Sequence, residues 1–371
     1  MPQSNHKKRI LFIHLGPFRF LAFLYLKNLS EILAQNNIEV YLATSSLEIV
    51  SLLKRDKNLT TIKLPPFSFW GSLLGTKDIL LLIRFLAKDS LLILQSLDYF
   101  SLFVVKLLRF SRKTPLVYFE VLPSGETFLF RFFQSYLYKP LFSNIRVITP
   151  LRFFVGQLEK EGIEKPLKVG LSFAKLPPLS SPSLNRAPVF GFLGDLTKAA
   201  RVDIFLRTCG LLAREGLDFK VAICGVGREE IYLRRLTKDL EIESRVNFYK
   251  NIVDFEKVML NFWLMVLPNY YYSALAGLLF AQAMAIPVIA ARLKPFSEII
   301  IEGENGYLVE PENPLAFKKA ILDLLSKNKR DKFGFTARKL FIENHQSRFL
   351  ARSILAFYEE FFDNLLKNKN S

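Results

Sequence analysis

Cysteine and histidine are scarce in this sequence. Its 371 residues include two cysteines, Cys209 and Cys224, and three histidines, His6, His14 and His345. Two cysteines exclude a disulfide framework and any cysteine-rich zinc or iron–sulfur site. Three histidines so far apart argue against a poly-histidine metal centre. We therefore expect no bound metal.

An unbroken apolar run of the kind that forms a membrane helix is also missing. Residues 258–291 carry no charge and are long enough to cross a bilayer. However, Pro268-Asn269 and Pro287 interrupt them, which favours the strand–helix–strand core of an α/β protein. The predicted elements are a strand at Phe262–Leu267, a helix at Ser273–Met284 and a strand at Val288–Ala290.

The N-terminus begins like a secretory signal but does not complete one. Lys7-Lys8-Arg9 precede the apolar residues Ile10–Ile13, but Gly16-Pro17 and Arg19 end the run too early. A first β-strand over Arg9–Leu15 explains the pattern better. We expect a cytoplasmic protein, in part because no targeting segment is recognisable.

Acidic residues are few relative to basic ones. The chain has 51 Lys and Arg against 34 Asp and Glu, a formal net charge of +17. Residues 1–185 contain 24 basic and 12 acidic residues, so most of the excess lies there. The expected partners carry phosphate or other anions, such as an anionic membrane surface or an anionic acceptor. We expect no nucleic-acid partner because no base-stacking or groove-reading motif accompanies the charge. A merely basic surface is the alternative.

Short apolar strands alternate with helices along most of the chain. The first half opens with a strand, a helix at Phe20–Gln35 and a strand at Ile38–Thr44. The alternation restarts at Val189–Leu193 and continues through a helix at Val202–Glu215 and a strand at Lys220–Cys224. This pattern predicts α/β architecture with parallel sheets covered on both faces.

Proline and serine mark the boundary between the two alternating regions. They cluster between Lys165-Pro166 and Pro188, which is typical of a linker. The tail over Gln346–Leu366 has the pattern of a long amphipathic helix. The predicted organisation is an N-terminal domain over 1–170, a linker over 171–187, a C-terminal domain over 188–345 and a terminal helix within 346–371.

Three turns of the second half place small residues where a strand ends and a helix begins. They contain Gly194-Asp195, Gly225-Val226-Gly227 and Asn269 with Ser273. Glycine lets a ligand approach the backbone, and the first amides of a helix can bind a diphosphate. Together the three turns indicate a nucleotide pocket at the carboxyl ends of the strands.

At these turns and beyond them, the second half resembles the C-terminal domain of the group 1 (family 4) glycosyltransferases. The resemblance extends from about residue 188 to 330 and is weaker in the first half. The matching segments are Gly194–Thr197, Val221–Gly227, Arg245–Phe248, Ala283–Ala290, Glu298–Val309 and Pro311–Ala316.

The resemblance implies a GT-B fold and a sugar transfer. In that fold two Rossmann-like domains face each other across a cleft, and the final helix returns to the N-terminal domain. The family moves a sugar from a nucleotide diphosphate donor to an acceptor, usually with retention and without a bound metal. The nucleotide sugar is then a substrate, and no permanently bound cofactor is expected.

The side chains that usually bind the donor in that family are largely replaced here. The family's Arg and Lys, which stabilise the leaving diphosphate, correspond to Asp195 and Ala200. Its two Glu, eight positions apart, correspond to Tyr272 and Phe280. Lys198 and Arg201 could supply the missing charge, or they could be ordinary solvated cations.

The remaining donor-site candidates are therefore mostly backbone positions. The full set of predicted donor-binding residues is Gly194, Lys198, Arg201, Gly225, Gly227, Asn269, Tyr272, Ser273, Ala274 and Glu298.

The first half supplies two further hypotheses. Glu120 and Glu126 stand in a loop and are candidate catalytic or acceptor-binding carboxylates, although loop carboxylates are often only solvated. Glu120 is also the loose counterpart of a front-domain His of the family. Residues Phe128–Phe142 form a strongly aromatic segment with a thin basic stripe, which suits either membrane-surface docking or a buried helix with one wet edge.

Two functions follow from these patterns. The first is a glycosyltransferase that builds a polysaccharide or glycolipid from a glycan or lipid-linked acceptor at the cytoplasmic membrane face. The second is a non-catalytic relative that keeps the fold and binds a partner enzyme or a glycan. The resemblance favours the first, and the replaced side chains favour the second.

Overall fold

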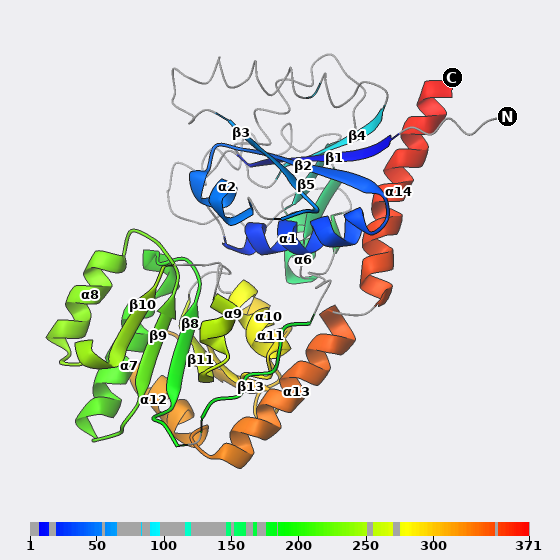
Figure 1. Ribbon diagram of the computed structural model, residues 1–371. Coiled ribbons are helices and arrows are strands. Elements are labelled where there is room, and N and C mark those ends of the chain that lie inside the picture. Colours follow the sequence, from blue (N-terminus) through cyan, green and yellow to red (C-terminus); the bar gives the residue numbers. More distant parts are fainter. Residues whose placement is uncertain are drawn as a thin grey trace. The chain divides into compact units, whose positions relative to one another are not determined.

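A computed structural model of the chain describes residues 7–14, 20–53, 56–64, 83, 90–96, 116–119, 146–149, 152–160, 166–168, 176–183, 185–250, 255–269, 275–345 and 348–370. The chain divides into two compact units (Figure 1). The first unit contains most of residues 1–174 together with Ser347–Ser371, and the second contains Lys175–Gln346. Each unit is built around one parallel sheet.

The first unit has a seven-stranded sheet in the order β3-β2-β1-β4-β5-β6-β7. Its interior strand β1 is buried from Ile10 to Ile13, as expected for a strand covered on both faces. All of its strand pairs are parallel. The strands are β1 (Lys7–His14), β2 (Ile38–Thr44), β3 (Thr60–Lys63), β4 (Ser90–Ser96), β5 (Leu116–Phe119), β6 (Arg146–Thr149) and β7 (Leu167–Lys168).

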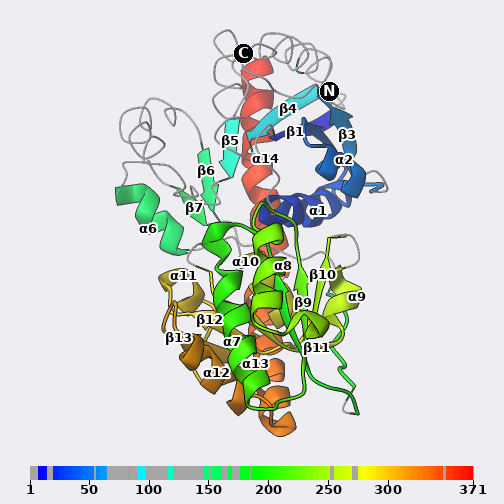
Figure 2. The same cartoon turned by 90° about the vertical axis from the view of Figure 1, so that its left-hand side faces the viewer.

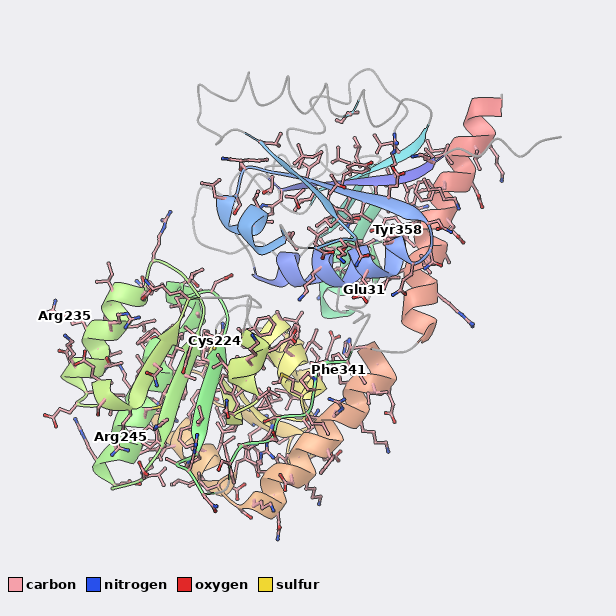
Figure 3. All side chains as sticks on the ribbon, in the orientation of Figure 1. Glu31, Cys224, Arg235, Arg245, Phe341 and Tyr358 are labelled. Carbon is pink, nitrogen blue, oxygen red and sulfur yellow. The ribbon has the colours of Figure 1, made fainter. Side chains whose placement is uncertain are left out.

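The last helix of the chain belongs to the first unit. Helix α14 (Arg348–Asn370) packs against β4, and its Tyr358 is fully buried (Figure 3). The Tyr358 hydroxyl donates a hydrogen bond to Gln95 Oε1, which lies in β4. The predicted return of the terminal helix to the N-terminal domain is therefore confirmed. The other helices whose bounds the structure gives here are α1 (Phe20–Ala34), α2 (Leu47–Leu53) and α6 (Arg152–Lys160).

The second unit has a six-stranded parallel sheet in the order β10-β9-β8-β11-β12-β13. The first strand of the unit therefore lies beside its fourth, and the chain reverses its direction of travel across the sheet between β8 and β11. This is the strand order of a dinucleotide-binding fold. The strands are β8 (Val189–Leu193), β9 (Lys220–Cys224), β10 (Val246–Tyr249), β11 (Phe262–Leu267), β12 (Val288–Ala291) and β13 (Gly306–Val309).

Helices cover both faces of this second sheet. Helices α7, α8 and α12 pack together, and Figure 2 views the molecule from their side. Helix α10 packs on α13 and on the central strands, and all nine of its residues are buried. The helices are α7 (Val202–Arg214), α8 (Glu230–Asp239), α9 (Phe255–Met259), α10 (Leu275–Ala283), α11 (Lys294–Ser297), α12 (Pro314–Asp323) and α13 (Lys327–His345), with short 3₁₀ turns at Lys198–Ala200 and Glu243–Arg245.

The uncharged stretch forms the centre of this unit. Strand β11, helix α10 and strand β12 follow one another through it, so the predicted strand–helix–strand interpretation is confirmed. In the part of the chain that the structure describes, no helix combines the length and apolarity that a membrane crossing requires.

The proline- and serine-rich segment is fastened to the second unit. Ser180 lies at its centre, where its backbone N–H donates to Met284 O at 2.8 Å and its Oγ lies 3.0 Å from Phe262 O. Arg330 Nη2 donates to Ser180 Oγ at 3.2 Å, and Arg338 Nη1 donates to Pro177 O at 3.1 Å. Helix α13 therefore binds residues 176–180 along the second unit.

Candidate donor site at the carboxyl edge of the second sheet

The carboxyl ends of β8 and β11 define the candidate site. These two strands are neighbours across the point where the strand order reverses, and ligands of open parallel sheets bind there. Gly194 follows β8, and Asn269, which is fully buried, follows β11. Helix α10 starts at the same edge, because a Cβ on Gly277 would stand only 2.6 Å from Leu193 O. Two predicted donor residues and a helix N-terminal turn therefore meet at one place.

The two glycine turns of this edge interlock with each other. Gly194 N–H donates to Cys224 O at 3.1 Å, and Leu196 N–H donates to Val226 O at 2.9 Å. A Cβ on Gly225 would lie 1.9 Å from Gly194 O, and a Cβ on Gly227 would lie 2.1 Å from Leu196 O. Both distances are far below van der Waals contact. Gly225 and Gly227 are thus required for the contact between the turns, whatever they do for a ligand.

Arg201 is held by two carboxylates. Its Nε and Nη2 donate to Asp203 at 3.1 and 3.3 Å, and its Nη1 pairs with Glu312. Arg201 and Glu312 both have left-handed backbones, with φ of 49° and 58°, and each lies just before a helix. This ion-pair cluster connects the start of α7 with the start of α12, and it offsets much of the positive charge of Arg201.

Lys198 stands in a different environment from Arg201. It is exposed in the 3₁₀ turn between Gly194 and α7, and no carboxylate among the described residues forms an ion pair with it. It is therefore the predicted cation of this edge that could turn to a diphosphate at little cost.

Two of the positions that the sequence analysis aligned with the family's donor-binding residues hold packed apolar side chains. Ala200 is fully buried. Phe280 is 4% exposed, and its ring meets the Phe255 ring edge to face with centroids 4.8 Å apart. Neither position can donate or accept a hydrogen bond through its side chain. Any donor recognition at this edge must use other groups.

Gln282 is a buried polar residue of the site region that the sequence analysis missed. It is the polar side chain of the otherwise apolar helix α10, and its Nε2 donates to Ile299 O at 3.2 Å. Asn305 Nδ2 donates to the same carbonyl at 2.9 Å, and its Oδ1 accepts Ile301 N–H at 2.7 Å. These bonds fix the loop after α11, at whose start the exposed Glu298 lies. A single glutamine in an apolar helix was the available signal.

The start of helix α8 carries negative charge at the same edge. Glu230 accepts hydrogen bonds from Arg234 at 2.9 Å and pairs with Lys250 at 3.1 Å. Burial raises the pKa of Glu230, but these two partners outweigh burial and lower it below its usual value. The carboxylate stays ionised at neutral pH and is engaged by both cations.

The carboxyl edge of the first sheet also holds polar side chains that the sequence analysis did not single out as a group. His14 ends β1, Thr44 ends β2 and Thr149 ends β6, and all three are fully buried. His14 Nδ1 lies 3.4 Å from Thr44 Oγ1, which accepts the Ser46 N–H at 3.1 Å. By the strand-end rule, this edge is where the first unit would hold an acceptor.

Several predicted site residues lie outside the described residues. These are the two catalytic candidates, three donor-site candidates and the aromatic segment, namely Glu120, Glu126, Tyr272, Ser273, Ala274 and Phe128–Phe142. Their predicted roles stay predictions. Within the described part of the chain, no group of three His, Cys, Asp or Glu side chains is arranged to hold a metal ion.

Both cysteines are predicted to be chemically silent in the native protein. Cys224 ends β9 beside the glycine turns, and burial raises the pKa of its thiol to about 12 (Figure 3). Burial raises the pKa of Cys209 as well, and neither cysteine forms a disulfide. Since the thiolate is the reactive form, a disulfide reagent should titrate no thiol at pH 8 in the native protein and both after denaturation. Rapid titration of one thiol in the native state would contradict this burial.

Comparison with solved structures places the fold in a class. The sucrose-phosphate synthase of Thermosynechococcus elongatus superposes with a TM-score of 0.77 at 15% identity, covering 96% of this chain and 100% of that one. HepE of Anabaena, crystallised with UDP and glucose, superposes with a TM-score of 0.80 at 16% identity, covering 95% and 100%. At these identities the likeness shows the fold alone. The chain has the α/β fold of the GT-B glycosyltransferases.

Comparison of sequences gives the family. Residues 180–340 match the model of the family described as glycosyl transferases, group 1. An uncharacterized glycosyltransferase of Haemophilus influenzae is 31% identical over 137 residues, 37% of this chain and 38% of that protein. The N-acetyl-alpha-D-glucosaminyl L-malate synthase of Bacillus anthracis is 27% identical over 180 residues, 48% and 46% respectively. Residues 180–340 are therefore similar to the group 1 glycosyltransferases, as the resemblance implied, and the match spans less than half the length of these curated relatives.

Proposed function

We propose that the chain is a glycosyltransferase that moves a sugar from a nucleotide diphosphate donor to a glycan or lipid-linked acceptor. One observation carries the proposal. Gly194, Asn269 and the first turn of α10 lie together where the strand order of the second sheet reverses, and this sheet lies within the residues that match the family model. HepE, whose crystals contain UDP and glucose, has the same fold. Backbone amides at that edge are suited to binding a diphosphate.

The proposed chemistry depends on charge that develops as the sugar departs. The diphosphate leaving group gains negative charge in the transition state, and donors fixed beforehand stabilise it most effectively. We assign this role to Lys198 and to the first backbone amides of α10, because the Gly194 and Leu196 amides already donate to Cys224 O and Val226 O. The proposal includes retention of anomeric configuration and independence from a metal, which the family resemblance implies. Analysis of the anomeric proton of the product by NMR and assays in chelator test these two parts.

The location and the acceptor are also part of the proposal. We propose action at the cytoplasmic face of the membrane as a peripheral protein, because the chain has a net charge of +17 and lipid-linked acceptors lie there. We assign acceptor binding to the buried polar residues at the carboxyl edge of the first sheet. Glu120 and Glu126 are further candidates for contact with the acceptor. Transfer of radiolabelled sugar to lipid extracts tests it.

A second function has its own support. The burial of Ala200 and Phe280 and the pairing of Arg201 with Asp203 and Glu312 remove side-chain charge and hydrogen bonding from the donor edge. A non-catalytic relative that binds a partner or a glycan would show these features. A panel of nucleotides and nucleotide sugars in thermal-shift measurements separates the two. A ligand at a hundred times its Kd stabilises by about 2.7 kcal/mol, which is roughly 5 °C or more in Tm, and the absence of any shift would favour the second function.

Lys198 and Arg201 are predicted to differ in what they contribute. Lys198→Ala should leave the Tm of the free protein unchanged and reduce the nucleotide-dependent shift, because this cation has no ion-pair partner among the described residues. Arg201→Ala should lower the Tm of the free protein by disrupting the pairs with Asp203 and Glu312. The nucleotide-dependent shift of Arg201→Ala should persist. The reverse pattern would assign the phosphate to Arg201.

A further inference from the structure

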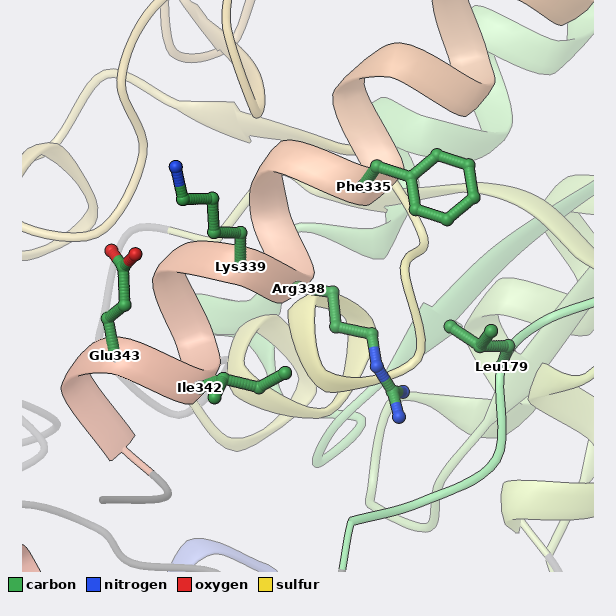
Figure 4. Close-up of a pocket in the computed structure, with 6 residues that line it drawn as sticks. All are labelled: Leu179, Phe335, Arg338, Lys339, Ile342 and Glu343. Atoms are coloured by element: carbon green, nitrogen blue, oxygen red, sulfur yellow. The ribbon is translucent and has the colours of Figure 1, made fainter.

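An apolar groove runs between helix α13 and the segment before β8. It has a volume of about 370 Å³ and is lined by Leu179, Phe335, Arg338, Lys339, Ile342 and Glu343. Figure 4 shows Phe335, Arg338 and Ile342 on the side of α13 that faces Leu179, with Lys339 and Glu343 pointing the other way. The groove lies wholly within the second unit and far along the sequence from the donor turns.

Three large apolar side chains are exposed along this groove. Phe335 is 65% exposed, Leu179 46% and Ile342 39%. A single exposed apolar residue needs no explanation, but three around one groove mark a surface that is normally covered. Since Phe335 and Ile342 are seven positions apart on one helix, they lie on the same face.

The groove contains a cation whose charge is not neutralised by the described residues. Arg338 Nη1 donates to the carbonyl oxygens of Pro177 and Ala283, which leaves its remaining donors for other groups. Among the described residues no carboxylate forms an ion pair with it, and burial lowers its pKa. An anionic group entering the groove would gain a charge-assisted hydrogen bond.

Positive charge also surrounds the apolar face. Helix α13 contains six Lys and Arg against two Asp and Glu. Lys332 is exposed three positions before Phe335, one helical turn away, whereas Lys339 points away from Leu179. Lysines that flank an aromatic residue can extend toward phosphates while the ring enters the interfacial region.

From this combination we infer that the groove face of α13 docks on an anionic phospholipid bilayer, with Phe335, Ile342 and Leu179 entering the headgroup region and Arg338 meeting a lipid phosphate. Exposed apolar side chains beside a cation without an ion-pair partner among the described residues match a bilayer, whose anionic headgroups border an apolar interior. Phe335 and Ile342 lie along one face of α13 with Leu179 opposite them, and Lys332 and Arg338 flank that face, as in helices that lie at an interface. The inference does not depend on transferase activity.

Sedimentation with vesicles tests the inference. The full-length protein should bind vesicles of phosphatidylcholine mixed with phosphatidylglycerol and should not bind pure phosphatidylcholine vesicles, and added salt should weaken binding steeply. Phe335→Gln with Ile342→Gln should reduce binding about tenfold or more. Lys332→Gln should reduce it about fivefold, from the loss of one attractive charge. Phe335→Trp should show a blue shift in emission on binding the mixed vesicles.

A matched control and three outcomes decide the matter. Ile231 is 84% exposed on α8, so Ile231→Gln removes an equally accessible apolar group elsewhere in the unit and should leave binding unchanged. If the Phe335 and Ile342 variants bind the mixed vesicles as well as the wild type does, the proposed site is wrong. Equal binding to neutral vesicles would overturn it too. A concentration-dependent dimer that the same variants dissolve would show that a second copy covers the face instead. Nucleotide-dependent thermal shifts measured in the same variants report on the donor site separately.

Discussion

Gly225→Ala is expected to unfold the second unit at the carboxyl edge of its sheet. The new Cβ would lie 1.9 Å from Gly194 O, and this obstacle is backbone, which cannot move aside as a flexible side chain can. The turn after β8 would have to separate from the turn after β9, with loss of the Gly194–Cys224 and Leu196–Val226 hydrogen bonds. We expect a loss of about 3 kcal/mol or more in the free energy of unfolding, measured by urea denaturation followed by circular dichroism.

A second glycine substitution provides the control for this experiment. Gly156 lies inside helix α6, and among the described residues no heavy atom would come within 4 Å of an added Cβ. Gly156→Ala should therefore stabilise the protein by about 0.5–1 kcal/mol through helix propensity. The same substitution is thus expected to lower the free energy of unfolding at Gly225 and to raise it at Gly156. A Gly225→Ala protein as stable as the wild type would show that the two turns are not in contact in solution.

Arg330→Met is expected to be the most damaging change in helix α13. Arg330 is 8% exposed and connects three segments, donating to Trp263 O at 3.3 Å, Ser180 Oγ at 3.2 Å and Asp331 at 2.7 Å. Its guanidinium also lies 5.6 Å from the centre of the Trp263 ring. Methionine fills similar volume but leaves the buried carbonyl and hydroxyl without their donor, at a cost of about 2–4 kcal/mol. Thermal unfolding measures the effect.

A control arginine and a double mutant test this explanation. Arg235 is exposed on α8, and Arg235→Met should change stability by about 0.5 kcal/mol or less (Figure 3). Ser180→Ala and Arg330→Met should be non-additive, because they remove two ends of one hydrogen bond. Additive effects would mean that residues 176–180 are held on the second unit by other contacts.

The two hypotheses about function lead to different expectations for the donor edge. The glycine turns have a demonstrable structural purpose, so their presence alone does not prove that a ligand binds. Lys198, which has no ion-pair partner among the described residues, is a group of this edge whose presence packing does not explain. A nucleotide-dependent shift that Lys198→Ala weakens would therefore be evidence for transfer chemistry that tolerates the loss of the usual side chains.

Short buried strands could be predicted from the sequence with accurate bounds. Strands at Ile38–Thr44, Val189–Leu193, Lys220–Cys224 and Phe262–Leu267 are confirmed residue for residue. Continuous apolar runs of this length, ending in glycine, proline or a polar residue, are typical of parallel strands covered on both faces. The α/β class with two sheets followed from their alternation with helices.

Helix bounds were less accurate where capping decides them. Apolar periodicity in the sequence predicts a helix over Ala316–Ser326, but α12 begins at Pro314. Asn313 Oδ1 accepts the Ala316 N–H at 3.1 Å, and proline is well suited to the first helical position. Asn313-Pro314 is a recognisable helix start in the sequence, but a search for apolar periodicity alone does not detect it.

The sequence by itself determined the fold class, because hydrophobic burial in a parallel sheet requires apolar runs that can be recognised locally. It also located the turns at which a nucleotide is proposed to bind. Tertiary structure alone decided what the residues around those turns do. Arg201 is neutralised by Glu312, 111 positions away. Helix α13 was not predicted, because its Gly334 and Arg330 are explained only by their contacts with Ala285 and Trp263. Contacts between distant segments depend on how the whole chain packs, and no local pattern records them.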